Sequence, residues 1–156
     1  MAKVLTGKRR DSLNSLAMDL RRALTDEYTI VSAPIVQGLQ LDAVVTGPQG
    51  LLVLLAKDWA GEIRPARNRI WRERLASGRV VTHPNPAGEA RRATKALRAF
   101  LKDEFPSLHP TIRHLVVFTD PGAKLIVHGP TEPPCTTPDH LANEIGALAP
   151  VSEEGS

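Results

Sequence analysis

The most constraining feature of this 156-residue chain is the segment 51–57, in which both alternating sets of side chains are apolar up to Lys57. Side chains alternate between the two faces of a strand, so a strand that is apolar on both faces must be covered on both. Residues 41–46 form a second apolar run, joined to the first by Gly47-Pro48-Gln49-Gly50, which suits a tight turn. The pair predicts the centre of a buried sheet.

The rest of the chain predicts elements that surround this pair. Further strands are expected, from runs of β-forming residues, at 28–36, 68–75, 79–82, 115–119 and 124–128. Helices are expected, from apolar residues spaced three and four apart and from capping residues, at 11–25, at 85–103 with Asn85 as cap and Pro86 in the first turn, and from Thr137-Pro138 onward. This order predicts an α/β fold, with a mixed central sheet flanked by helices.

Length and composition set further expectations. The length suits one domain, expected over residues 1–149, and the small, acidic residues 150–156 are expected to form a disordered tail. The longest apolar run, 51–56, is far below the roughly 20 residues of a membrane span, so a cytoplasmic protein without membrane association is expected. Cys135, the single cysteine, excludes an internal disulfide, and it has no obvious partner base for nucleophilic chemistry.

Positive charge is concentrated in one part of the sequence. Residues 64–98 carry ten Lys or Arg against two Asp or Glu, whereas residues 1–63 are balanced and residues 99–156 are acidic. A basic block of this density attracts polyanions such as DNA, although a solvated surface can have the same composition. Its Trp71 suits core packing better than base stacking, and the arginines beside it keep stacking open.

An ordered set of short motifs runs through residues 11–119. Its strongest part is Leu-Gln-Leu-Asp-Ala-Val-Val at 39–45, followed by Gly47-Pro48, Gly50 and the apolar strand that ends in Lys57. It continues with Gly61, Ile63, Trp71, Asn85-Pro86, Glu89, Leu97 and the apolar strand 115–118. This set resembles the nuclease-related (NERD) domain, a branch of the PD-(D/E)xK nuclease superfamily. The resemblance implies a restriction-endonuclease-like core and a metal-dependent nuclease ancestry.

The resemblance also implies a site. Asp42 matches the metal-binding Asp, Lys57 matches the lysine that assists the attacking water, and Mg²⁺ or Mn²⁺ is the implied cofactor if the domain is catalytic. The family's Glu two residues before the lysine is Leu55 here, which cannot bind a cation. Asp11, or Arg10 in its place, matches an acidic position near the first helix.

Two further carboxylates could replace the missing one. Asp58 lies next to Lys57, and Glu62 lies just beyond Gly61. Alternatively, Asp42 is no ligand and forms an ion pair with Lys57, which costs less than burying either charge alone.

Three functional hypotheses follow. The first is a metal-dependent nuclease, and the second is a catalytically impaired relative that binds nucleic acid, in particular DNA. The third, from another class, is a non-catalytic protein-interaction or structural domain, with a protein partner or a second copy of the chain. The basic side chains expected at a nucleic-acid interface are Arg64, Arg67, Arg69, Arg72, Arg91, Arg92 and Lys95.

Overall fold

A computed structural model of the chain describes residues 16–127, apart from 19 and 23, and residues 131–148. The strands are β1 (Thr29–Ser32), β2 (Ile35–Val36), β3 (Leu39–Gln40), β4 (Ala43–Gly47), β5 (Gly50–Lys57), β6 (Glu62–Arg64), β7 (Ile70–Arg74), β8 (Val80–Pro84), β9 (Ile112–Phe118), β10 (Lys124–Leu125) and β11 (Cys135–Thr136). The helices are α2 (Ala87–Glu104) and α3 (Pro138–Ala147), and residues 16–18 and 20–22 are also helical. The tail predicted at 150–156 lies outside the described residues, as does most of the helix predicted at 11–25.

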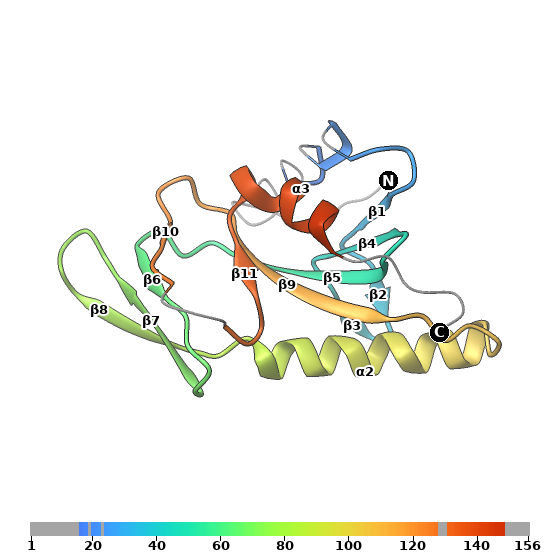
Figure 1. Ribbon diagram of the computed structural model, residues 1–156. Helices are drawn as coiled ribbons and strands as arrows, with labels where there is room; N and C mark the ends of the chain where they lie inside the picture. Colours follow the sequence, from blue (N-terminus) through green and yellow to red (C-terminus); the bar gives the residue numbers. More distant parts are fainter. Residues whose placement is uncertain (1–15, 19, 23, 128–130, 149–156) are drawn as a thin grey trace.

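The central sheet has five strands in the order β1-β4-β5-β9-β11. β5 lies in the middle, antiparallel to β4 and parallel to β9, so the sheet is mixed (Figure 1). The predicted α/β fold and the central position of β5 are confirmed. Because β5 is covered on both faces, apolar side chains occur along it without alternation.

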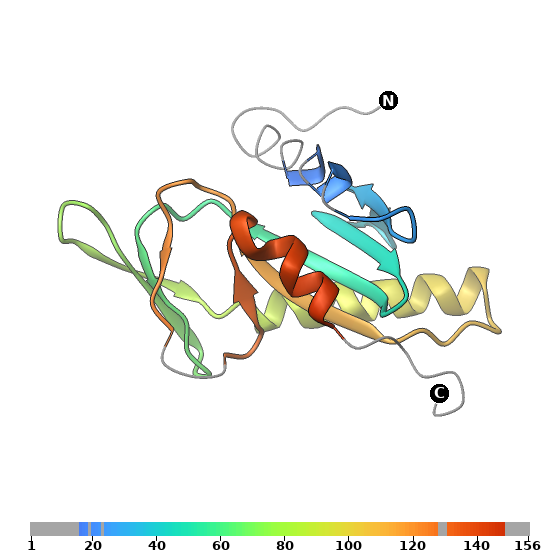
Figure 2. The same ribbon diagram turned by 45° about the horizontal axis from the view of Figure 1, so that its top comes forward.

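Each face of the central sheet has its own core. On one face Val53 and Leu55 of β5 pack in a cluster with Ala93 and Leu97 of the long helix α2. The opposite face packs against α3 and the N-terminal helical residues (Figure 2). This second cluster consists of Leu16, Leu20, Ala43, Val45, Leu52, Leu54, Leu115, Val117, Leu141 and Ile145. No helix among the described residues is long and apolar enough to cross a membrane.

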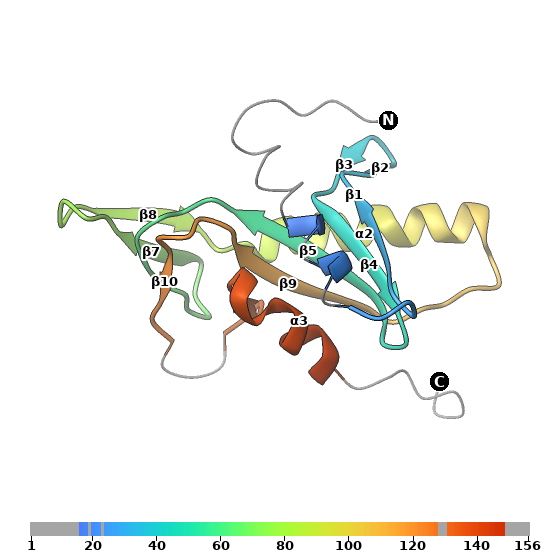
Figure 3. The ribbon, with the colours of Figure 1, turned by 90° about the horizontal axis from the view of Figure 1, so that it is seen from above.

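The strands predicted at 68–75 and 79–82 are present and form a hairpin, which belongs to a separate sheet. β7 and β8 join β6 and β10 in a four-stranded sheet of order β10-β6-β7-β8, which extends beyond one end of the central sheet (Figure 3). Ile63 and Trp71 are fully buried on its inner face. The Trp71 ring lies 6.3 Å from that of Phe118 at the end of β9. The core-packing interpretation of Trp71 is therefore confirmed.

Several boundaries differ from the predictions. The strand predicted at 28–36 is broken into β1 and β2, because Ala33 adopts a positive φ of 50° and donates its N–H to the Asp42 carbonyl at 2.8 Å. Helix α2 begins at Ala87, after Pro86. β11 lies in a proline-rich segment for which the sequence predicts no strand. Two residues between prolines give no strand pattern, and pairing with β9 forms the strand.

Candidate functional site

Asp42 lies between β3 and β4 and is 5% exposed. Its Oδ2 accepts a hydrogen bond of 2.8 Å from the backbone N–H of Ala56 in β5. The ladder between β4 and β5 has ended at this point, because Ala43 pairs with Leu54. The carboxylate therefore takes the place of a strand carbonyl, and this bond helps to offset the cost of burying a charged group.

Leu55 occupies the position at which the family resemblance implies a Glu. It is 2% exposed and belongs to the apolar cluster under α2. Alternation along β4 and β5 puts Asp42, Leu55 and Lys57 on this same face of the sheet. The structure thus brings the predicted Asp and Lys to one face, with an apolar side chain between them.

Lys57 pairs with a carboxylate that the sequence analysis had not assigned to it. Its Nζ forms an ion pair with Glu89 Oε1, and both side chains are partly exposed. Glu89 lies in the first turn of α2, where the helix dipole favours a negative charge. One of the two interpretations of Asp42 paired it with Lys57, and the ion pair described for Lys57 is with Glu89. The sequence held a signal for Glu89 as a residue of this site, because Glu89 stands where the family motif has Gln.

The two carboxylates proposed as replacements lie elsewhere. Asp58 is exposed, and Glu62 is in β6 of the second sheet, opposite Arg74. Across the described parts of the chain, no group of three or more His, Cys, Asp or Glu is placed to hold a metal ion. Arg10 and Asp11 lie outside those parts. The described side chains alone therefore do not fit a divalent-metal centre of the expected kind.

Glu73 is a buried carboxylate that the sequence analysis missed. It is 5% exposed, its Oε2 accepts the N–H groups of Ala60 and Gly61 at 2.9 Å each, and its Oε1 lies 2.9 Å from His83 Nε2. Trp59 stacks on the His83 ring with centroids 3.7 Å apart. Glu73 thereby fastens the second sheet to the segment that leaves β5. Its position two residues after the buried Trp71, on the same strand face, was the available signal.

Gly61 permits this close approach. A Cβ at this position would lie 2.2 Å from the carbonyl oxygen of Arg74, which is backbone and cannot move aside cheaply. The backbone of the segment after Lys57 can therefore approach the backbone of β7 this closely only with glycine at position 61.

Two of the predicted basic residues face each other on the outer face of the second sheet. Arg64 in β6 and Arg72 in β7 are exposed register partners, and Arg74 follows on the same face. Like charges directly opposite one another destabilise a strand pair unless an anion or solvent screens them. The outer face of this sheet is therefore a positively charged surface.

Asn85 positions the other basic residues. Its Nδ2 donates to the carbonyls of Asn68 at 2.8 Å, Glu132 at 3.1 Å and Ala66 at 3.4 Å, and its Oδ1 accepts the Ala87 N–H at 2.8 Å. The loop that carries Arg67 and Arg69 is thus held against the start of α2. On that helix the guanidinium groups of Arg91 and Arg92 both lie 3.8 Å from where a Cβ on Gly88 would be, over the first turn. Lys95 is exposed one turn further on.

Cys135 has the properties of a structural thiol. Burial raises the pKa of the thiol, while a contact of 3.8 Å with the Thr131 hydroxyl lowers it by a smaller amount. A thiol with a raised pKa stays protonated at neutral pH and is a poor nucleophile. The structure is consistent with the expectation that Cys135 has no nucleophilic role.

Comparison with known proteins gives one family. The model of the nuclease-related domain (NERD) matches residues 8–119, which is more than half of the chain. A search of curated proteins and a search of solved structures found no match. The matched region runs from before β1 to just after β9, and it contains Asp42, Leu55, Lys57, Glu89 and the basic block. The chain belongs to the nuclease-related domain family.

Proposed function

We propose that this chain is a nuclease-related domain that binds DNA, and that its catalysis is impaired because the metal site lacks one carboxylate. The observation that carries the proposal is the buried, apolar environment of Leu55 between Asp42 and Lys57 on one sheet face. An alkyl side chain supplies no oxygen ligand, and Mg²⁺ or Mn²⁺ requires several oxygen ligands.

The contacts of the neighbouring side chains support the same proposal. One oxygen of Asp42 is bonded to the Ala56 N–H, and the ammonium of Lys57 is bonded to Glu89. A lysine that assists a water must be able to reach it, and the ion pair holds the ammonium toward α2. Two departures from the family motif, Leu55 in place of Glu and Glu89 in place of Gln, thus favour structure over catalysis at this place.

The positive surface supports the DNA-binding part. Arg64 and Arg72 lie side by side on an exposed sheet face, and Asn85 holds the loop with Arg67 and Arg69 beside the start of α2. Phosphate contacts from such side chains position a strand without reading its sequence. Binding of this kind is therefore expected to be strongly dependent on salt.

The first test is cleavage of plasmid and of single-stranded DNA with Mg²⁺ or Mn²⁺. We expect wild type to cleave no faster than Lys57→Ala, since the site lacks a ligand. Metal-dependent cleavage that is lost in both Lys57→Ala and Asp42→Asn would refute the proposal that catalysis is impaired. Glu89→Gln would then show whether Glu89 replaces the missing carboxylate.

The second test is a DNA-binding titration against salt. If about four arginines contact phosphates, the affinity should fall about a hundredfold between 50 and 200 mM salt. The double variant Arg64→Gln/Arg72→Gln should lower the slope of log K against log salt by about two, or one per lost contact. The matched control is Arg21→Gln/Arg22→Gln, which removes two exposed charges from the N-terminal helical residues and should leave the slope unchanged.

Salt-independent binding, or no binding, would exclude the DNA-binding role. The remaining function would then be a protein-interaction or structural domain of the same fold. Light scattering on the purified chain would test whether a second copy is the partner.

A further inference from the structure

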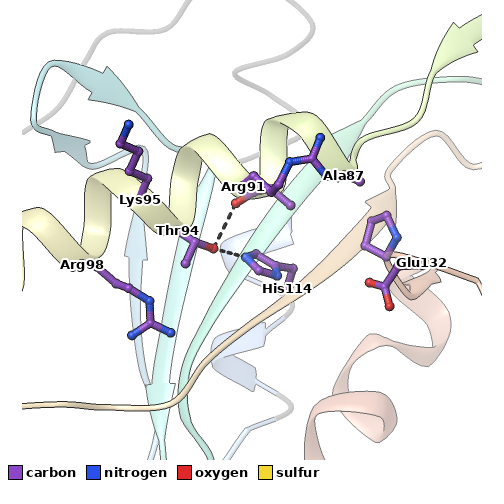
Figure 4. Close-up of a pocket in the computed structure, with 9 residues that line it drawn as sticks. Ala87, Arg91, Thr94, Lys95, Arg98, His114 and Glu132 are labelled. Carbon is purple, nitrogen blue, oxygen red and sulfur yellow. Dashed lines mark hydrogen bonds between the residues drawn. The ribbon is translucent and has the colours of Figure 1, made fainter. Parts of the chain in front are cut away.

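A cavity of about 580 Å³ lies between α2, β9 and the segment that precedes β11 (Figure 4). Its lining combines a basic helix face, an imidazole and a few apolar groups: Ala87, Ala90, Arg91, Thr94, Lys95, Arg98, His114, Glu132 and Pro133. Ligand sites in proteins are commonly concave, about 300–1,000 Å³ in volume and mainly apolar, with a few placed polar groups. The cavity has a volume in this range and carries placed polar groups, and Asp42 and Lys57 are not among its lining residues.

The charges around the cavity favour an anion. Arg91, Lys95 and Arg98 follow one another at intervals of four and three residues, so they share one face of α2. Like charges at this spacing repel, and Glu132 is the one carboxylate among the lining residues. A bound anion would relieve this repulsion.

Two of the cations lie at opposite ends of the cavity. Figure 4 shows Arg91 and Arg98 on opposite sides of Thr94 along the helix, while the Lys95 side chain points away from His114. Arg91 also leans back over the first turn of α2, close to Gly88, where the helix dipole is positive. Planar guanidinium groups match the geometry of a phosphate better than an ammonium does.

The inner wall of the cavity is uncharged when His114 is neutral. Thr94 donates its hydroxyl hydrogen to the Ala90 carbonyl at 3.0 Å, and the same oxygen contacts His114 Nε2, so this nitrogen is the donor in that contact. Burial lowers the pKa of His114, which is consistent with a neutral imidazole at pH 7. With Ala87, Ala90 and Pro133 this ring forms an uncharged surface of the kind that packs against a base.

We propose that this cavity binds a nucleotide phosphate, either as a free nucleotide or at the end of a DNA strand. The phosphate lies against Arg98, the base lies against the neutral wall, and Arg91 supplies a second positive charge at the other end of the cavity. Glu132 is then available to accept a hydrogen bond from a sugar hydroxyl or a base amino group. For a strand end the inference rests on the proposed DNA-binding function. For a free nucleotide it does not.

The first experiment is calorimetric titration of the chain with deoxyadenosine monophosphate, with deoxyadenosine and with inorganic phosphate. We expect the nucleotide to bind at least about tenfold more tightly than either of the others, because each lacks half of the contacts. Arg98→Gln should weaken nucleotide binding about tenfold, and Arg91→Gln should weaken it by a smaller factor. Lys102→Gln removes the same charge from an exposed position in the last turn of α2 and should change nothing. Ala87→Leu, which fills the cavity without altering charge, should weaken binding as well.

Equal binding of nucleotide and nucleoside, or equal losses in Arg98→Gln and Lys102→Gln, would overturn the inference. Circular dichroism of each variant separates these outcomes from a failure to fold.

The second experiment compares single-stranded oligonucleotides with and without a 5′-phosphate. A preference for the phosphorylated strand that disappears in Arg98→Gln places a strand end in the cavity. Salt-sensitive binding of both strands, without nucleotide binding, would refute the cavity as a nucleotide site and leave the proposed DNA-binding function intact. Nucleotide binding without binding of either strand would refute the proposed function and identify a free nucleotide as the ligand.

Discussion

Leu55→Glu is expected to destabilise the domain by about 3 kcal/mol or more in metal-free buffer and to create a binding site for Mn²⁺. The stability loss follows from the 2% exposure of Leu55, since the substitution removes apolar packing and buries a carboxylate. The gain in metal affinity follows from Asp42, whose carboxylate lies on the same face of the sheet opposite residue 55 and would bind the ion together with the new one. A metal that binds only the folded state raises stability, by about 1.4 kcal/mol at ten times its Kd.

Thermal unfolding with and without Mn²⁺ measures both effects. Leu55→Gln is the matched control, because it has nearly the same shape and polarity without the charge, and it should lose stability without recovering it in Mn²⁺. Wild type should show little response to the ion. If Leu55→Glu folds and gains nothing from Mn²⁺, Asp42 and residue 55 do not form a metal site and the proposed ancestry of this site is wrong.

Glu73→Ala is expected to lower the free energy of unfolding by about 3–5 kcal/mol. The substitution leaves the N–H groups of Ala60 and Gly61 without their acceptor and removes the partner of His83. Urea denaturation should show a lower midpoint with the slope retained, because the same surface is exposed on unfolding.

Two further variants test the cause of that loss. Glu104→Ala removes a carboxylate from the exposed last turn of α2 and should change stability by less than about 0.5 kcal/mol. Glu73→Gln keeps one oxygen acceptor and should fall between wild type and Glu73→Ala. A loss below about 1 kcal/mol in Glu73→Ala would mean that other contacts hold the second sheet in place.

The parts of the fold that could be predicted are those governed by local pattern. The two-sided apolar strand β5, the β7–β8 hairpin and helix α2 each follow from spacing within a few residues. The division into two sheets could not be predicted, because it depends on how Glu73 and Gly61 meet across 12 residues of sequence. β11 likewise exists only through its pairing with β9.

The sequence indicated the residues of the candidate site, but their contacts became visible only in the structure. Motif resemblance identified Asp42, Leu55 and Lys57, but the partners of a charge depend on tertiary structure. Glu89, 32 positions after Lys57, reaches it only because the start of α2 packs over the end of β5. The cavity beside α2 could not be predicted from the sequence for the same reason, since its lining residues His114 and Arg98 come from separate elements.

The hydrogen bonds of Asn85 have a consequence for motion. Its amide nitrogen carries two hydrogens, yet three carbonyls lie within reach, two from the loop between β6 and β7 and one from the segment before β11. Three acceptors must therefore share two donors, so a shift that withdraws one carbonyl frees a hydrogen for the others. When the hydrogen bond of Asn85 to the Glu132 carbonyl lengthens, its bonds to the loop between β6 and β7 can shorten, and the reverse also holds. Movements of the basic loop and of the cavity wall are therefore opposed through the Asn85 side chain.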